Sequence, residues 1–89
     1  MYLLGDIGNT ETKICIVNDN NKILKKIILQ TNLINKKYLN SNLNSLIKKY
    51  KNIRSVLFSS VVPFAYKKIK IYMSNKLKKK IFEIKQIKI

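Results

Sequence analysis

The stretch YLLGDIGNTETKICIV, residues 2–17, contains two apolar runs separated by a short polar segment. The first run, Tyr2 to Ile7, ends at Gly8 and predicts a central strand covered on both faces. The second run, Thr12 to Val17, predicts a neighbouring strand. Asn18 to Asn21 is a dense turn signal, because Asn and Asp tolerate left-handed backbone. These residues therefore predict the beginning of an antiparallel meander.

The rest of the chain continues as strands and helices in alternation. Ile23 to Gln30 predicts a third strand, and Asn40-Ser41 offers a cap for a helix of about three turns. Ser55 to Ser59 predicts a buried strand parallel to the first, because a helix connects the two. Pro63 predicts the first turn of a second helix, and Phe82 to Ile89 predicts a fifth strand. Apolar residues at helical spacing mark the inner faces of the two helices: Leu43, Leu46, Ile47 and Tyr50 in the first, Tyr66, Ile69, Met73 and Leu77 in the second.

The predicted order is strand, strand, strand, helix, strand, helix, strand. This order is typical of an α/β, ribonuclease-H-like domain, in which helices pack on one mixed five-stranded sheet. No linker or repeat divides the chain, so residues 1–89 are expected to form a single domain.

The composition limits which function classes need to be considered. The formal net charge of +15 favours an anionic partner. However, the chain has 18 Lys, 15 Ile and 11 Asn against a single Arg, which indicates A/T-rich codons more than selection for phosphate contacts. A lone Cys15 and the absence of His exclude an intramolecular disulfide and the usual zinc ligands, which favours a reducing cytoplasm. No stretch approaches the roughly 18 apolar residues of a membrane span.

The polar segment after the first strand has the residues that a polyphosphate loop needs. Gly8 lets the backbone approach an anion and is free to take a positive φ. The Asn9 amide and the Thr10 hydroxyl are further donors, and Lys13 brings a positive charge. Asp6 is compatible with phosphate if a hydrated Mg²⁺ lies between them. An ordinary tight turn would use the same residue types, so the segment alone leaves both interpretations open.

Two motifs together resemble a known family. Asp6-Ile7-Gly8-Asn9-Thr10 is similar to the first phosphate motif of type III pantothenate kinases, which belong to the acetate and sugar kinase, heat-shock and actin superfamily. Phe58-Ser59-Ser60-Val61-Val62-Pro63 resembles the strand end and turn that follow in that family. Both motifs fall on predicted strand ends, in the family's order.

The resemblance implies a transferase that moves the γ-phosphoryl group of ATP to pantothenate, the first step of coenzyme A biosynthesis. It implies Mg²⁺ and a monovalent cation, K⁺ or NH4⁺, as further cofactors, and often a homodimer. Asp6 would lie near the metal, and Ser59 and Ser60 would line the cleft. The implied ATP-binding residues are Asp6, Ile7, Gly8, Asn9, Thr10, Glu11, Thr12 and Lys13.

The resemblance covers only the family's N-terminal half, one lobe of a two-lobed kinase. The family's catalytic aspartate, its monovalent-cation aspartate and its second lobe would lie beyond Ile89, so no catalytic residue is assigned. We therefore expect the chain to be incomplete for catalysis alone. It would be a truncated gene product, a split-gene half that needs a complementing C-terminal half, or a domain of a longer protein.

Two alternatives stay open at this point. One is a basic nucleic-acid-binding module, which would use the lysines on and after the second predicted helix and stack bases on tyrosines. Helical spacing places Tyr50, Tyr66 and Tyr72 near apolar positions, so core packing explains these tyrosines more simply. The other alternative is the N-terminal half of a different small-molecule kinase of the same superfamily, because acceptor specificity lies outside this chain. The basic cluster comprises Lys67, Lys68, Lys70, Lys76, Lys78, Lys79 and Lys80.

Overall fold

The computed structural model describes residues 1–79 and 81–84. Its element order confirms the predicted succession of strands and helices and adds one short 3-10 turn. In chain order the elements are β1 (Tyr2–Ile7), β2 (Glu11–Val17), β3 (Ile23–Gln30), η1 (Thr31–Leu33), α1 (Lys36–Lys49), β4 (Ser55–Ser60), α2 (Pro63–Leu77) and β5 (Ile81–Glu83).

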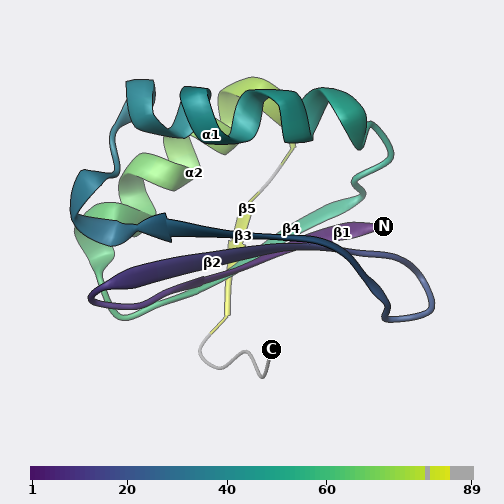
Figure 1. The fold of residues 1–89 in the computed structure, drawn as a ribbon, viewed down its shortest axis with the longest axis horizontal. Helices are drawn as coiled ribbons and strands as arrows, with labels where there is room; N and C mark the ends of the chain where they lie inside the picture. Colours follow the sequence, from purple (N-terminus) through teal and green to yellow (C-terminus); the bar gives the residue numbers. More distant parts are fainter. Residues whose placement is uncertain (80, 85–89) are drawn as a thin grey trace.

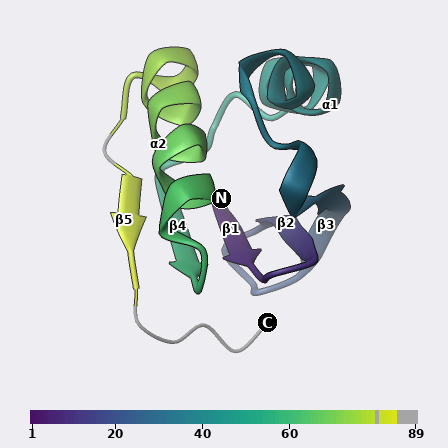
Figure 2. The same cartoon turned by 90° about the vertical axis from the view of Figure 1, so that its left-hand side faces the viewer.

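The five strands form one mixed sheet in the order β3-β2-β1-β4-β5. β1 is antiparallel to β2 and parallel to β4, and β4 is parallel to β5. Figures 1 and 2 show both helices on the same side of this sheet. The α/β fold predicted from the sequence is therefore confirmed.

The core lies between the helices and one face of the sheet. Strand residues alternate between the two faces, so Leu3 and Ile7 of β1 are buried, whereas Tyr2, Leu4 and Asp6 are only partly buried. The prediction that β1 is covered on both faces is wrong for the described residues, since α1 and α2 lie on one face only (Figure 2) and the residues on the other face are partly exposed. The helices contribute these buried side chains to the core: Leu39, Leu43, Leu46 and Ile47 from α1, and Ala65, Ile69, Tyr72 and Met73 from α2.

The first helix begins earlier than Asn40-Ser41. Its N-cap is Asn35, whose Oδ1 accepts a hydrogen bond from the backbone N–H of Tyr38 at 2.8 Å. Leu39 is fully buried and extends the apolar face one turn toward the N-terminus. The predicted cap at Asn40-Ser41 is wrong, because the buried Leu39 belongs to the helix and lies before it. Asn40 and Ser41 lie inside the helix.

The observed ends of the other elements differ less from the predicted ones. Pro63 occupies the first turn of α2, as predicted. The predicted fifth strand, Phe82 to Ile89, corresponds to β5 at Ile81–Glu83, and residues 85–89 lie outside the described residues. Neither α1 nor α2 combines the length and the hydropathy that crossing a bilayer requires.

Gly5 fixes the contact between the two central strands that matter most for the site. It pairs with Phe58 across β1 and β4, and a Cβ atom at position 5 would overlap the Phe58 ring. Phe58 is fully buried against this gap. A glycine inside a strand often marks such a close approach, and Gly5 therefore holds β1 and β4 in the packing that aligns their ends.

Candidate phosphate-binding site

The sheet brings the two sequence motifs side by side. Asp6 of β1 pairs with Lys13 of β2 on one side and with Ser59 of β4 on the other. The three residues thus form one row across three strands, on the sheet face opposite the helices, and each is partly buried. Asp6 forms no ion pair with any residue that the structure describes. A carboxylate, an ammonium group and a hydroxyl therefore share one edge of the sheet.

The loop between β1 and β2 is a tight hairpin closed by its first residue. The backbone N–H of Gly8 donates to the carbonyl of Glu11 at 2.9 Å. No glycine has a positive φ, so Gly8 does not use the left-handed backbone that its lack of a side chain permits. The position instead needs a small residue for a steric reason, because a Cβ atom at Gly8 would lie 3.0 Å from the Glu11 carbonyl oxygen.

The tip of this loop presents donors to solvent. Asn9 and Thr10 are exposed. Within residues 1–79 and 81–84, neither their backbone N–H groups nor their side chains donate a hydrogen bond. The backbone N–H of Gly8 already donates within the hairpin, so it is not available to a ligand. The backbone N–H groups of Asn9 and Thr10 are the donors that remain available to a phosphate oxygen.

Two residues of the predicted ATP-binding segment face the core instead of the loop surface. Ile7 and Thr12 pair with each other across β1 and β2, and both are fully buried beneath the helices. Their side chains hold the hairpin in place and do not reach a ligand. Glu11 is exposed at the start of β2.

The two serines of the second motif also lie on different faces of the sheet. Ser59 lies in the row with Asp6 on the open face of the sheet. Ser60 pairs with Ile7, and its hydroxyl oxygen accepts from the N–H of Val62 and donates to the Val62 carbonyl, both at 3.0 Å. Ser60 therefore shapes the turn into α2, and Ser59 is the serine available to a cleft. The N–H of Val61 also donates to the Ile7 carbonyl at 3.1 Å, which ties the two strand ends together.

Thr31 is a residue of this site that the sequence analysis missed. It begins η1, directly after β3, and is 7% exposed. Its hydroxyl donates to the Gly8 carbonyl at 2.8 Å, and its backbone N–H donates to the Thr10 carbonyl at 3.0 Å. No local pattern marks it, because it lies 23 residues from Gly8 in the sequence.

The donor set fits Mg²⁺ held largely by phosphate and water. The described residues contain no group of three or more His, Cys, Asp or Glu side chains that could hold a metal ion. Asp6 is the one carboxylate in the row with Lys13 and Ser59. Mg²⁺ in phosphotransfer sites is usually bound by one or two carboxylates plus substrate phosphates and water, and Asp6 would be its protein ligand.

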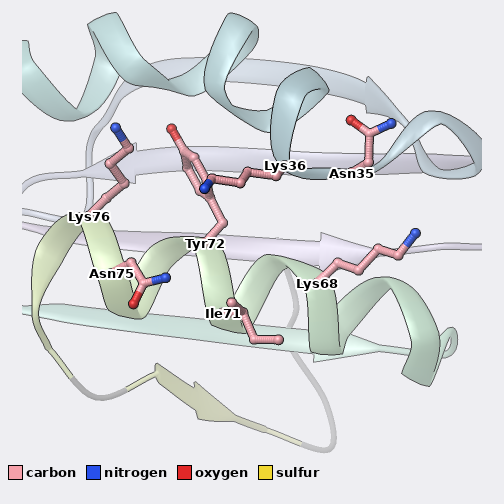
Figure 3. Close-up of a pocket in the computed structure, with 7 residues that line it drawn as sticks. All are labelled: Asn35, Lys36, Lys68, Ile71, Tyr72, Asn75 and Lys76. Carbon is pink, nitrogen blue, oxygen red and sulfur yellow. The ribbon is translucent and has the colours of Figure 1, made fainter.

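A cavity of about 520 Å³ lies elsewhere, in the helix layer between α1 and α2 (Figure 3). None of the described residues that line it is a carboxylate. The Tyr72 hydroxyl donates to Asn40 Oδ1 at 3.3 Å, and burial raises the pKa of this phenol. The cavity takes in none of the motif residues, so it does not contribute to the phosphate-binding edge. Its lining residues are Asn35, Lys36, Lys68, Ile71, Tyr72, Asn75 and Lys76.

The fold and the paired strand ends place the chain in the class with the actin-like ATPase fold, to which sugar kinases belong. A Porphyromonas gingivalis protein, provisionally assigned as an N-acetylglucosamine kinase, matches it with a TM-score of 0.68 and 25% sequence identity. The match covers 93% of this chain and 33% of that protein.

Within that class, the chain belongs to the type III pantothenate kinase family, whose family model matches residues 2–89. A type III pantothenate kinase from Pelagibacter ubique (strain HTCC1062) is 47% identical to it over 87 residues. That alignment covers 98% of this chain and 35% of the relative, so the chain spans about a third of the relative's length. The resemblance inferred from the two motifs is confirmed.

Proposed function

We propose that this chain supplies the ATP-phosphate-binding lobe for the phosphorylation of pantothenate. The observation that carries the proposal is the row of Lys13, Asp6 and Ser59 beside a loop whose Asn9 and Thr10 donors have no acceptor within the described chain. The membership in the type III pantothenate kinase family and the name of the Pelagibacter relative support the choice of pantothenate as the acceptor.

Each residue at this edge has a distinct role in the proposed reaction. The backbone N–H groups of Asn9 and Thr10 would donate to phosphate oxygens, and the Lys13 ammonium would offset the charge of the phosphates. Asp6 would hold a hydrated Mg²⁺, which neutralises charge on the phosphates as the terminal group is transferred. Ser59 would contribute a hydroxyl to the floor of the cleft beside Asp6.

The transfer itself also needs a base. The acceptor hydroxyl oxygen forms a bond to the γ-phosphorus, the bond to the bridging oxygen breaks, and ADP leaves with that electron pair. The hydroxyl proton must pass to a general base. Of the chain's four carboxylates, Asp6 is assigned to the metal, and Asp19 lies at the opposite end of the sheet from the loop. No motif surrounds Glu11 or Glu83, and the chain has no His. We therefore propose that the base belongs to a complementing C-terminal half or to residues beyond this chain.

The remaining parts of the proposal rest on family membership. We propose that K⁺ or NH4⁺ takes part, that the working assembly is a homodimer or includes a complementing half, and that the reaction takes place in the cytoplasm. A different small-molecule acceptor would leave the roles of Asp6, Asn9, Thr10 and Lys13 unchanged.

Binding of Mg-ATP to the purified chain tests the lobe assignment. Calorimetric titration should give saturable, Mg²⁺-dependent binding that Asp6→Asn abolishes. Asp19→Asn is the matched control, because it neutralises a carboxylate in the other turn of β2 and should leave binding intact. If both variants bind Mg-ATP as well as the parent chain, the assignment fails. RNA binding that weakens steeply with salt and depends on Lys78 to Lys80 would instead support the nucleic-acid alternative.

An activity assay tests whether the chain is incomplete. The chain is incubated with ATP, Mg²⁺, K⁺ and pantothenate, and phosphopantothenate is measured. We expect none, because the proposed base is supplied from elsewhere. Product formed by this chain alone would contradict its incompleteness while leaving the phosphate-binding role in place.

A further inference from the structure

Thr31 fastens both ends of the Gly8–Thr10 loop from the core side. Its hydroxyl holds the carbonyl of the first loop residue at 2.8 Å, and its backbone N–H holds the carbonyl of the last at 3.0 Å. Because Thr31 follows β3 directly, these bonds tie the loop to a third strand in addition to the two that it connects.

The hydroxyl hydrogen bonds behind the loop can run in only one direction. Each threonine hydroxyl has a single hydrogen. The Gly8 carbonyl can only accept, so the Thr31 hydrogen is used there. The Thr12 hydroxyl, 2.9 Å away and fully buried, must then donate to Thr31. The donors thus run from Thr12 to Thr31 to Gly8, and no buried side-chain polar atom in the described chain lacks a partner.

This direction fixes which way the loop amides point. In a trans peptide the C=O and the following N–H point in opposite directions, and the described chain has no cis peptide bond. When Thr31 holds the Gly8 carbonyl toward the core, the Asn9 N–H must point away from Thr31. The bond from the Thr31 N–H to the Thr10 carbonyl orients the peptide plane between Thr10 and Glu11 in the same way. The Glu11 N–H therefore also points away from Thr31.

We propose that Thr31 is a positioning residue for phosphate recognition. It keeps the backbone N–H of Asn9 pointing toward the anion site before the ligand binds. The proposal rests on the proposed function for the identity of the ligand. Donors that are already oriented avoid the ordering cost that a mobile loop would incur on binding. The Thr31 hydroxyl, buried behind the loop, acts through Gly8 and does not touch the phosphate.

Two variants separate the Thr31 hydroxyl from the rest of its side chain. Thr31→Val keeps the shape but loses the bond to the Gly8 carbonyl. Thr31→Ser keeps the hydroxyl and loses the methyl group. Thr12→Val is the matched control, because it removes the buried donor to Thr31 and leaves the bond from Thr31 to Gly8 in place. If Thr31→Val does not fold, Thr31→Ala removes the same bond with a smaller side chain.

Two measurements read out the effect. ¹⁵N relaxation of the Asn9 amide in the free chain reports loop order, and calorimetry reports Mg-ATP affinity. We expect Thr31→Val to raise Asn9 mobility and to weaken Mg-ATP binding about tenfold, the worth of one well-placed hydrogen bond. Thr31→Ser should match the parent chain in both measurements. Thr12→Val should lower thermal stability while the Asn9 amide stays ordered.

The outcomes distinguish the positioning role from the proposed function. An ordered Asn9 amide and unchanged affinity in Thr31→Val would overturn the positioning role. So would a Thr31→Ser variant that behaves like Thr31→Val, since packing of the methyl group would then be the cause. If the parent chain does not bind Mg-ATP, the proposed function fails, and the relaxation data alone still decide whether Thr31 orders the loop.

Discussion

The two turns at either end of β2 are both built from polar, turn-forming residues, but their polar groups are arranged in opposite ways. Figure 1 shows them at opposite ends of the sheet. In the Asn18–Lys22 turn, Asn18 Oδ1 accepts from the N–H groups of Asn20 and Lys22 at 3.0 and 2.9 Å. In the Gly8–Thr10 loop, the Asn9 and Thr10 donors have no acceptor among the described residues.

The carboxylates of the two regions also differ in whether a described residue forms an ion pair with them. Asp19 forms ion pairs with the Met1 ammonium and with Arg54, at 2.7 and 2.6 Å. Asp6 forms none within the part of the chain that the structure describes. A turn built for structure satisfies its polar groups internally, whereas a turn built for a ligand leaves them available. Residue composition alone does not separate the two cases.

The largest expected effect comes from forcing apart β1 and β4, the two strands whose ends carry the sequence motifs. Gly5→Ala places a methyl group where the Phe58 ring lies, so β1 and β4 must separate. We expect the free energy of unfolding to fall by about 3 kcal/mol, typical of severe overpacking, with loss of Mg-ATP binding. Urea denaturation and calorimetry measure the two effects. A second change, Phe58→Leu, should restore part of the stability, and a Gly5→Ala chain as stable as the parent would contradict this packing.

Asn18→Ala should disturb the structural turn alone. It removes the acceptor of two backbone N–H groups, and we expect a loss of about 1–2 kcal/mol in the free energy of unfolding. Mg-ATP affinity, measured by calorimetry below the unfolding transition, should stay unchanged. Weakened binding in this folded variant would mean that the two turns are coupled through β2.

Asn9→Ala should have the opposite effect, with weaker Mg-ATP binding and nearly unchanged stability. The Asn9 side chain is exposed and makes no hydrogen bond within the described chain, so stability in urea should change little. The loss of a ligand donor should weaken Mg-ATP binding by up to about tenfold. A stability loss comparable to that of Asn18→Ala, with unchanged affinity, would show that Asn9 is a structural residue like Asn18.

The smallest effect is a pH dependence confined to the Asn18–Lys22 turn. The hydrogen bond from the Met1 ammonium, followed by the charge of Arg54, lowers the pKa of Asp19 below its ordinary value of 3.8. Its contribution to stability is therefore present above pH 3.8 and lost as the pH falls through the lower folded-state pKa. Melting temperatures across this acid range should fall less steeply for Asp19→Asn than for the parent chain. Identical slopes would mean that these exposed ion pairs add nothing, a common result for surface pairs.

The sequence predicts the parts of the fold that repeat over many residues. Strand alternation and helical spacing gave the element order and the two strand-end motifs, and the register places Asp6 beside Ser59. The predicted helix cap at Asn40 is wrong, because the sequence offers Asn at both position 35 and position 40. Only the burial of Leu39 shows that the helix begins after the first of them. The steric need for glycine at position 8 is also not visible in the local sequence, which does not reveal how closely the Glu11 carbonyl approaches it.

Contacts between distant residues account for most of what the sequence could not show. Thr31 matters because β3 returns beside the loop, and nothing near Thr31 in the sequence indicates this. The ring of Phe58 over Gly5 depends on the pairing of β1 with β4, more than fifty residues apart in the chain. The separate roles of Ser59 and Ser60 follow from which sheet face each occupies, and that face is set by a register that only the folded sheet defines.

The strand register also sets how the chain tolerates changes in length. Side chains alternate with a period of two, so one residue inserted into β1 before Asp6 would exchange the positions of the Asp6 carboxylate and the Ile7 side chain. A charge would enter the core, and an apolar group would face the phosphates. At the other end of β2, the register already shifts between Ile16 and Val17. Insertions and deletions between relatives should therefore collect at the Asn18–Lys22 end of the sheet, and the spacing from Tyr2 to Lys13 should stay constant.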